Sequence, residues 1–270
     1  MTETGNPLDG AVVVVTGGGT GVGQALALEA GRRGARIAVL APDPADATLQ
    51  AVKELGSEAI WVDVDITDYE AVSTSIPRVI DAFGVIDILV NNAAGSASAG
   101  PLQTTDPMTV RRQFEINVLG TYHCLRAYFE PLAQSASQGR FAHVLNVGSE
   151  HSLGVPAYVP PMSTYTVSKY TSLAFTDVLR RDFAEAGVGV TLLAPGWVLT
   201  ELVRKFAAQV PALAESVQGR GQEPELVAKL AWDAVVARRY IAMTNPASRP
   251  FAEAHALEVL ASIRQGDADA

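Results

Sequence analysis

A cluster of glycines near the amino terminus is the feature that most restricts the fold. Residues 11–15 form a short apolar run, glycines follow at positions 17, 18, 19, 21 and 23, and residues 21–33 have helical spacing. A strand, a glycine turn and a helix in this order place backbone N–H groups and the positive end of a helix dipole at one point, which suits a pyrophosphate. No Gly-Lys-Ser/Thr sequence follows, which excludes the loop of nucleoside triphosphatases. The stretch predicts a dinucleotide site, and a simple glycine-rich turn is the alternative.

Apolar runs continue to alternate with helical segments along the chain. The expected strands are residues 36–40, 58–62, 86–90, 141–147, 189–193 and 240–243, and the expected helices are residues 45–55, 68–83, 107–133, 165–186 and a last one from about 250. This alternation predicts an α/β, doubly wound Rossmann fold, with helices on both faces of a central parallel sheet of about seven strands. No linker or repeat divides the chain. We therefore expect residues 1–270 to form a single domain, with a substrate-loop region around 198–224 and a C-terminal tail over 244–270.

Composition disfavours several classes of partner. The net charge is -9, and no basic cluster is longer than two residues, which disfavours a nucleic-acid surface. The single cysteine, Cys124, lies in an apolar helical run and cannot form an intrachain disulfide. Neither a signal peptide nor an apolar run long enough to cross a membrane is evident. No His, Cys and Asp cluster has the spacing of metal ligands. We expect a cytoplasmic protein with no nucleic-acid, membrane or metal partner.

Tyr165 and Lys169 form a second pattern, inside the expected helix 165–186. Residues four apart share one face of a helix, so the phenol and the ammonium can point into the same space. A nearby cation favours the phenolate and is expected to lower the pKa of Tyr165 from its ordinary value near 10. A tyrosine tuned in this way can exchange a proton with an alcohol or a ketone. A surface pair without chemistry is the alternative for these two residues taken alone.

Two further motifs, Asn91-Asn92-Ala93 and Pro195-Gly196, follow the glycine turn in the chain. With Thr16-x-x-x-x-Gly21-x-Gly23, Gly17 and Tyr165-x-x-x-Lys169, they resemble the short-chain dehydrogenase/reductase family over about residues 10–245. The resemblance implies an oxidoreductase that uses NAD or NADP, in which Asn91 braces the central sheet. The family usually has Asn-Asn-Ala-Gly in the second motif, whereas Ala94 takes the fourth position here.

The resemblance also implies roles for individual residues. Asp65 and Ile66 would hold the adenine, while Val198 and Thr200 would hold the nicotinamide carboxamide. Asn117 would order a proton-relay water, and a buried structural asparagine is the alternative. The full set expected at the cofactor is Thr16, Gly17, Gly19, Thr20, Gly21, Val22, Gly23, Ala41, Asp43, Asp65, Ile66, Asn92, Ala93, Tyr165, Lys169, Pro195, Gly196, Val198 and Thr200.

Two serines compete for the role of orienting the substrate oxygen. Ser149 follows the expected strand 141–147, which is the family's position for this serine, and it lies 16 residues before Tyr165. The usual family gap is about three residues shorter and would select Ser152. We choose Ser149, because a strand end is a fixed position and the proline-rich segment after it can absorb an insertion. The predicted catalytic set is Asn117, Ser149, Tyr165 and Lys169.

The choice between NAD and NADP depends on the end of the second strand. An acid there selects NAD through the ribose hydroxyls, and a base accepts the additional phosphate of NADP. Residues 41–44 contain no lysine or arginine, Asp43 lies among them, and Thr20 takes a position that is often basic in NADP-dependent members. NAD is therefore the preferred prediction and NADP the alternative. Asp43 can equally be a solvated turn residue.

The sequence limits the class of substrate but does not identify the substrate itself. Two segments, residues 150–162 and 197–208, are expected to line its pocket with mostly apolar side chains, which favours a ring-bearing or aliphatic secondary alcohol or ketone. Glu150 and His151 are the polar candidates, and a surface-loop position is the preferred interpretation of His151. The expected pocket residues are Ser149, His151, Val155, Tyr158, Met162, Trp197, Leu202 and Phe206.

Two wider predictions concern assembly and catalysis. The family resemblance implies a homodimer or homotetramer paired through the helices over 107–133 and 165–186. The competing function is a dinucleotide-binding regulatory protein that keeps the fold without turnover.

Overall fold

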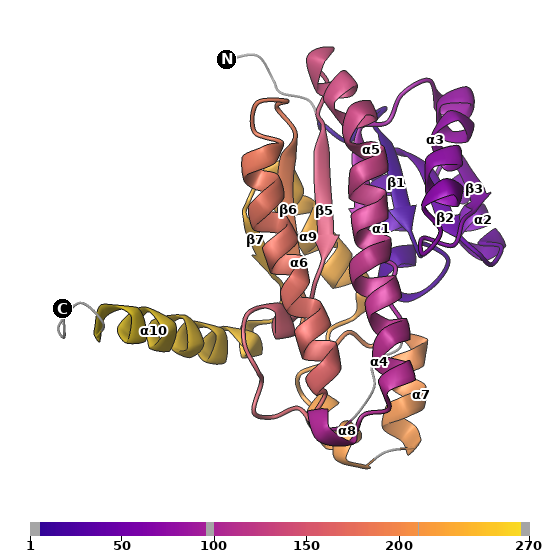
Figure 1. Ribbon diagram of the computed structural model, residues 1–270. Helices are drawn as coiled ribbons and strands as arrows, with labels where there is room; N and C mark the ends of the chain where they lie inside the picture. Colours follow the sequence, from indigo (N-terminus) through magenta and orange to yellow (C-terminus); the bar gives the residue numbers. More distant parts are fainter. Residues whose placement is uncertain (1–5, 96–99, 210, 266–270) are drawn as a thin grey trace.

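A computed structural model describes residues 6–95, 100–209 and 211–265 of the chain. Within them, a single parallel sheet has the strand order β3-β2-β1-β4-β5-β6-β7 (Figure 1). The strands are β1 (Val12–Thr16), β2 (Arg36–Ala41), β3 (Ala59–Asp63), β4 (Ile88–Asn91), β5 (His143–Val147), β6 (Gly189–Ala194) and β7 (Ile241–Met243). The order reverses direction between β1 and β4, and ligands of doubly wound sheets bind outside the carboxyl ends of the strands at such a point. The predicted Rossmann fold is confirmed.

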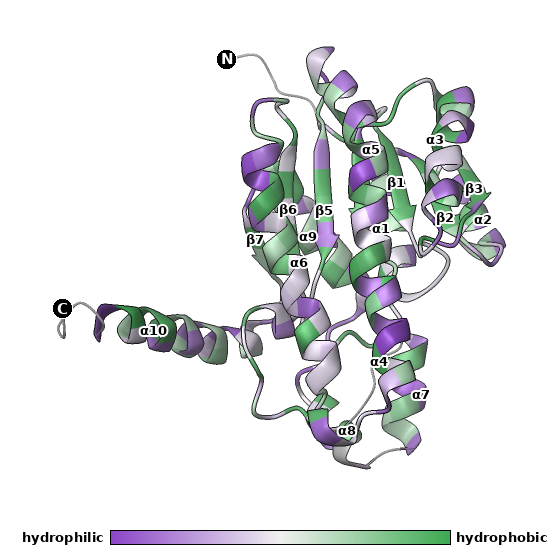
Figure 2. Ribbon diagram, viewed as in Figure 1, coloured by the Kyte–Doolittle hydropathy of each residue, from purple (hydrophilic) through white to green (hydrophobic). Residues whose placement is uncertain are grey.

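Helices cover both faces of the sheet. One face carries α1 (Gly21–Arg32), α2 (Asp46–Glu54) and α9 (Pro224–Val236), and the other carries α3 (Tyr69–Phe83), α4 (Pro107–Phe114), α5 (Thr121–Ser137) and α6 (Ser163–Asp182). Alternate residues of β1 serve the two cores: Val13 packs with Trp232 of α9, and Val14 packs with Tyr128 of α5. This two-sided burial explains why the strands are mostly apolar, as Figure 2 shows, although β5 also carries the buried polar residues His143 and Asn146.

The helix expected over residues 107–133 has a wider turn within it. A π-helical segment, Glu115–Gly120, joins α4 to α5, and it contains Asn117. Isolated π turns inside helices frequently occur at functional sites. Gly120 lies in the same segment, where an added Cβ would come within 2.6 Å of Ile66. The periodicity of the sequence did not reveal this turn, because one additional residue hardly alters an apolar pattern over such a length.

The substrate-loop region contains two short helices, α7 (Glu201–Gln209) and α8 (Pro211–Val217). Short 3-10 turns occupy Leu102–Thr104, Glu150–Ser152 and Pro246–Ser248. The last helix, α10 (Arg249–Gln265), projects away from the body (Figure 1). Only its start is anchored: the Phe251 ring packs edge-on against Tyr158, and Nε2 of His255 lies 3.2 Å from the hydroxyl of Tyr170. None of the helices in the described part of the chain combines the length and apolarity needed to cross a membrane.

Candidate active site

The glycine turn follows β1 and adopts a backbone that requires glycine. Gly17 and Gly21 have φ angles of +62° and +58°, in the left-handed region. Gly23 is required for space, because an added Cβ would lie 2.3 Å from Nδ2 of Asn92 and 2.4 Å from the Gly17 carbonyl oxygen. The amino terminus of α1 therefore packs directly against the turn. This close approach leaves backbone N–H groups without side-chain cover, as a bound phosphate requires.

A cavity of about 370 Å³ adjoins this turn. The predicted residues that line it are Gly17, Thr20, Val22, Gly23, Asp65, Ile66, Asn92 and Ala93. The Thr67 backbone N–H donates to Oδ1 of Asp65 at 2.9 Å and holds the pKa of this carboxyl below its ordinary value. Arg112 of α4 also lines the cavity, with its guanidinium 3.8 Å from the Asp65 carboxylate. No motif in the sequence points to Arg112, because the packing of α4 decides its place.

Five residues predicted at the cofactor line neither this cavity nor the second one described below, and one of them, Gly21, lines a hollow beside α7 instead. Oγ1 of Thr16 accepts the backbone N–H groups of Asn92 and Ala93, both at 3.0 Å, and so ties β1 to the chain after β4. The Gly19 carbonyl accepts the Thr48 hydroxyl, and Gly19 lines the same hollow beside α7. Ala41 and Asp43 differ in exposure. The Ala41 carbonyl accepts a hydrogen bond from the indole N–H of Trp61, whereas the Asp43 side chain is exposed.

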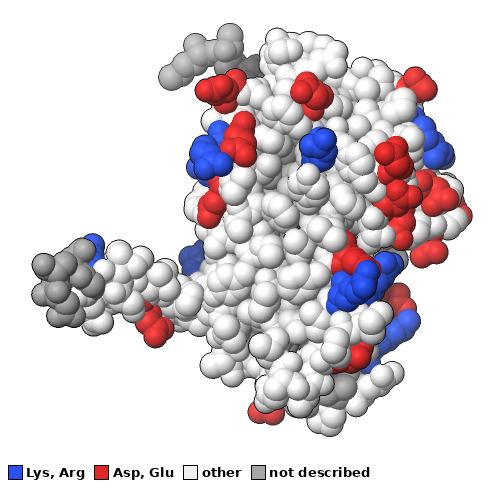
Figure 3. Space-filling view, viewed as in Figure 1, with Lys and Arg blue, Asp and Glu red and all other residues white. Residues whose placement is uncertain are grey.

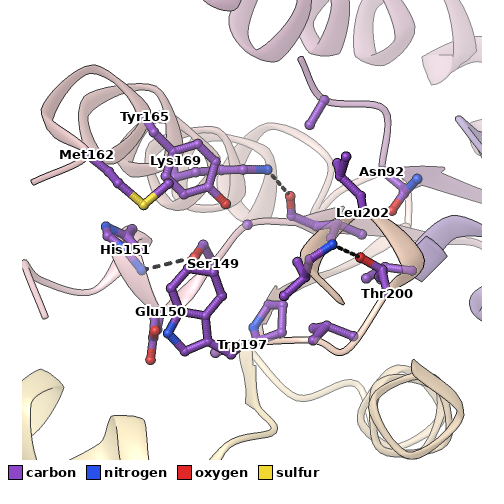
Figure 4. Close-up of a pocket in the computed structure, with 18 of the residues that line it drawn as sticks. Asn92, Ser149, Glu150, His151, Met162, Tyr165, Lys169, Trp197, Thr200 and Leu202 are labelled. Carbon is purple, nitrogen blue, oxygen red and sulfur yellow. Dashed lines mark hydrogen bonds between the residues drawn. The ribbon is translucent and has the colours of Figure 1, made fainter. Parts of the chain in front are cut away.

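A second cavity, about 320 Å³ in volume, lies at the carboxyl ends of β5 and β6 (Figure 4). Ser149 comes from the end of β5, Tyr165 and Lys169 from one face of α6, and Pro195 from the end of β6. The predicted residues that line it are Val22, Asn92, Ser149, His151, Met162, Tyr165, Lys169, Pro195, Gly196, Trp197, Val198, Thr200 and Leu202. Asn92 and Val22 line both cavities, so the two adjoin around the glycine turn.

The electrostatics of Tyr165 and Lys169 differ from the prediction. Nζ of Lys169 donates to the Val147 carbonyl at 3.0 Å and lies 5.9 Å from the centre of the Tyr165 ring. Burial lowers the pKa of Lys169 to about 8. Burial also raises the pKa of Tyr165, while the Ser149 hydroxyl opposes that increase. The prediction that Lys169 lowers the pKa of Tyr165 is therefore wrong for this structure, since burial outweighs every favourable contact of the phenol.

The two competing serines occupy different environments. Ser149 lines the cavity and interacts with Tyr165. Ser152 is fully buried away from it: its hydroxyl donates to the Lys169 carbonyl at 2.7 Å and accepts the Ser149 backbone N–H at 3.1 Å. Ser152 therefore fixes the backbone between β5 and α6, and Ser149 is the serine within reach of a ligand.

Asn117 lies beside the cavity without lining it. Its Oδ1 accepts the Gly95 backbone N–H at 2.8 Å, and its Nδ2 donates to the Ser168 hydroxyl at 3.0 Å. Both contacts join α6 and the segment after β4 to the π-helical turn. A structural contribution of this side chain is evident, and its link to a relay water stays a prediction.

The structure corrects the predicted substrate wall in three places. Val155 is 72% exposed and Phe206 is 45% exposed, and neither lines the cavity. The Tyr158 hydroxyl turns away to donate to the Glu150 carboxylate. His151 is buried, contrary to the surface-loop interpretation: its Nδ1 lies 2.8 Å from the Thr166 hydroxyl, and burial lowers its pKa to about 4. Glu150 itself lines the cavity. The start of α10 covers this loop, and such long-range packing is invisible in the local sequence.

Comparisons with known proteins agree with this geometry. The sequence profile of the family described as short chain dehydrogenase matches residues 11–211. The short-chain dehydrogenase anuF of Penicillium roqueforti is 33% identical over 241 residues, which cover 80% of this chain and 86% of that protein. The probable oxidoreductase EphD of Mycobacterium tuberculosis is 34% identical over 214 residues, which cover 77% of this chain but only 35% of that protein. A Burkholderia phymatum short chain dehydrogenase/reductase, solved in complex with NAD, has a TM-score of 0.80 at 27% identity and covers 92% of this chain and 93% of its own.

Proposed function

This chain belongs to the short-chain dehydrogenase family of oxidoreductases, and we propose that it interconverts a secondary alcohol and a ketone with a nicotinamide dinucleotide. The observation that carries the proposal is the convergence of Ser149, Tyr165 and Lys169 on one cavity that adjoins the glycine turn. Nicotinamide supplies or accepts the hydride in such chemistry, and the protein supplies orientation and proton transfer.

The residues present fit a dinucleotide. The turn offers backbone N–H groups with no Cβ at Gly17, Gly21 and Gly23, and the two adjoining cavities provide room for an adenine and a nicotinamide half. Val198 and Thr200 line the nicotinamide side, where they would hold the carboxamide. NAD is preferred over NADP because residues 41–44 contain no cation that could pair with a 2′-phosphate.

Proton handling is assigned to the side chains around the substrate oxygen. The Ser149 hydroxyl donates a hydrogen bond to that oxygen, and the Tyr165 hydroxyl gives or takes its proton. Lys169 remains mostly cationic at pH 7, because its pKa is about 8, and its ammonium would bind ribose hydroxyls. Asn117 would order the relay water through which the proton returns to solvent. Ser152 holds the backbone that positions Ser149 and Lys169.

The substrate proposed from the cavity wall is apolar and aliphatic or ring-bearing. Met162, Trp197, Val198, Leu202 and Val203 supply most of its apolar surface. A hydrophobic wall with a few fixed polar groups is the usual composition of a small-molecule site.

Absorbance at 340 nm with NAD or NADP and a panel of secondary alcohols and ketones tests the proposal. Reduction of the dinucleotide that is lost in Tyr165→Phe supports it. The competing function, a regulatory protein that binds the dinucleotide without turnover, predicts equal binding by wild type and Tyr165→Phe and no turnover on any substrate. Separate titrations of NAD and NADP by tryptophan fluorescence would decide the cofactor preference.

We further propose a homodimer or homotetramer that pairs through α5 and α6. A groove between these helices is lined by apolar side chains that include Leu125, Phe129, Phe175 and Val178. Figure 3 shows that the middle of this face carries few charged residues. Sedimentation that gives the mass of a monomer would refute this assembly.

A further inference from the structure

Glu150 is an acidic residue in the cavity wall, directly after Ser149. Only 2% of its surface is exposed, and the residue lines the same cavity as Ser149 and Trp197 (Figure 4). A buried carboxylate beside the reacting groups is costly, because it loses hydration that only hydrogen bonds or a cation can replace. The contacts of the Glu150 carboxylate therefore show which hydrogen bonds the protein leaves for a ligand to make.

Two hydroxyls stabilise the Glu150 carboxylate, and both reach the same oxygen. The Tyr158 and Ser248 hydroxyls each donate to Oε2. Among the described residues, no lysine or arginine forms an ion pair with this carboxylate. The guanidinium of Arg220 lies over the Tyr158 ring, 4.8 Å from its centre, and its charge favours the carboxylate less than burial disfavours it. Both hydrogen bonds that the carboxylate accepts from the described residues end on Oε2, which leaves Oε1 without one.

A donor without a partner lies in the same wall. Nε1 of Trp197 is buried, and it finds no hydrogen-bond acceptor in the described part of the chain. Buried N–H groups are nearly always paired, so an unpaired one in a ligand cavity is unusual. Trp197 and Glu150 lie on the same side of the cavity as Ser149 in Figure 4. One free acceptor and one free donor on this side match a ligand hydroxyl, which can donate to the first and accept from the second.

We propose that Glu150 and Trp197 form a subsite for a second hydroxyl of the substrate, apart from the oxygen that reacts at Ser149 and Tyr165. The substrate is then a neutral diol or hydroxyketone. The carboxylate repels anionic substrates, and a mono-alcohol leaves both polar groups unpaired. Tyr158 and Ser248 act as positioning residues, because they fix Oε2 and direct Oε1. This inference rests on the proposed alcohol or ketone chemistry.

The subsite is tested by the ratio of kcat/KM for a diol to kcat/KM for the matching mono-alcohol. Cyclohexanol and the cyclohexane-1,2-, 1,3- and 1,4-diols would be compared by kcat/KM at saturating NAD. For the wild type, at least one diol is expected to exceed cyclohexanol by about tenfold or more, because sites built to bind a hydroxyl discriminate strongly against analogues that lack it. Glu150→Gln is expected to lower the diol-to-cyclohexanol ratio by about tenfold. A role of Glu150 in holding Ser149 alone would lower both kcat/KM values together and leave the ratio unchanged.

Glu201→Gln is the matched control. It removes one carboxylate beside the rim residues Thr200 and Leu202, but its side chain is 82% exposed and pairs with Lys205. The ratio should stay at the wild-type value in this variant. Trp197→Phe should lower the ratio as Glu150→Gln does, and the emission assigned to Trp197 by difference should shift when the diol is added but not when cyclohexanol is added.

The outcomes separate the two proposals. Turnover of cyclohexanol with no diol preference, or an equal ratio in wild type and Glu150→Gln, overturns the subsite and leaves the proposed function standing. Failure to turn over any alcohol or ketone with either dinucleotide overturns both.

Discussion

Lys169 is expected to make the stability of this protein depend on pH in the alkaline range. Burial lowers its pKa from 10.5 to about 8 in the folded state. Between these values the unfolded chain binds a proton that the folded chain does not, so the free energy of unfolding rises with pH. Below pH 8 the lysine is protonated in both states, and its burial lowers stability by a constant amount. At about 1.4 kcal/mol for each pKa unit, this amount is about 3.5 kcal/mol.

Lys169→Met isolates the effect, because methionine keeps an unbranched side chain without an ionisable group. The variant also leaves the Val147 carbonyl without its donor, but that loss is the same at every pH. Relative to the variant, the wild type should gain about 2.5 kcal/mol in free energy of unfolding between pH 7 and pH 10. Other groups also contribute to the pH dependence in this range. The Cys124 thiol, for example, titrates there in the unfolded chain, while in the folded chain burial raises its pKa to about 12. Such groups occur in both proteins, so their contributions cancel in the difference.

Urea denaturation of both proteins, followed by circular dichroism at pH 7, 8, 9 and 10, measures this difference. The usual error of such additive comparisons is about 0.5 kcal/mol. If the difference in free energy of unfolding between wild type and variant stays constant within that error from pH 7 to pH 10, the lysine has an ordinary pKa in the folded protein. The lysine would then not be buried as the packing of α6 against the end of β5 requires.

Four further predictions follow from the site and the proposed interface. Tyr165→Phe should reduce turnover by about 10³-fold at unchanged Kd for NAD, measured by absorbance and fluorescence. For ketone reduction, in which Tyr165 must be protonated, Ser149→Ala should move the alkaline limb of the pH–rate profile to higher pH, since the Ser149 hydroxyl lowers the pKa of the phenol. Gly23→Ala should lower the free energy of unfolding by about 1–3 kcal/mol in urea denaturation and should weaken NAD binding in titrations. Gly19→Ala is the control: its added Cβ makes only ordinary contacts, so stability and NAD binding should both stay unchanged. Val178→Glu should convert an oligomer to a monomer in sedimentation.

Local sequence patterns were sufficient for the fold and for the centre of the site. Strand ends and the glycine turn could be located because a parallel sheet buried on both faces favours mostly apolar strands, and because Gly17 and Gly21 need left-handed backbone. The spacing of Tyr165 and Lys169 placed both on one face of α6. These features depend on neighbours within a few residues of each other in the chain.

Contacts between distant segments decided the features that the sequence did not reveal. Tyr158, an expected wall residue, instead serves Glu150, because Ser248 and Phe251 arrive from about 90 residues further along the chain. His151 is buried for the same reason, since its partner Thr166 lies on α6. No periodic pattern in the sequence encodes such contacts between distant segments. The residues that shape the substrate side are therefore the ones that sequence patterns predict least well.

The tyrosine and lysine illustrate the limit of reasoning from helical spacing. Spacing sets their common face but not the atoms they meet, and here both meet the end of β5. Lys169 donates to the Val147 carbonyl, and Tyr165 interacts with the Ser149 hydroxyl. Because Ser149 and Val147 are two residues apart on one backbone, a shift of this strand end changes the contacts of the phenol and of the ammonium together. Ser152 holds that backbone to α6 through the Lys169 carbonyl. The docking of β5 on α6 thus contributes, beside burial, to the acidity of the phenol, and a change at buried Ser152 should alter this acidity without touching a ligand.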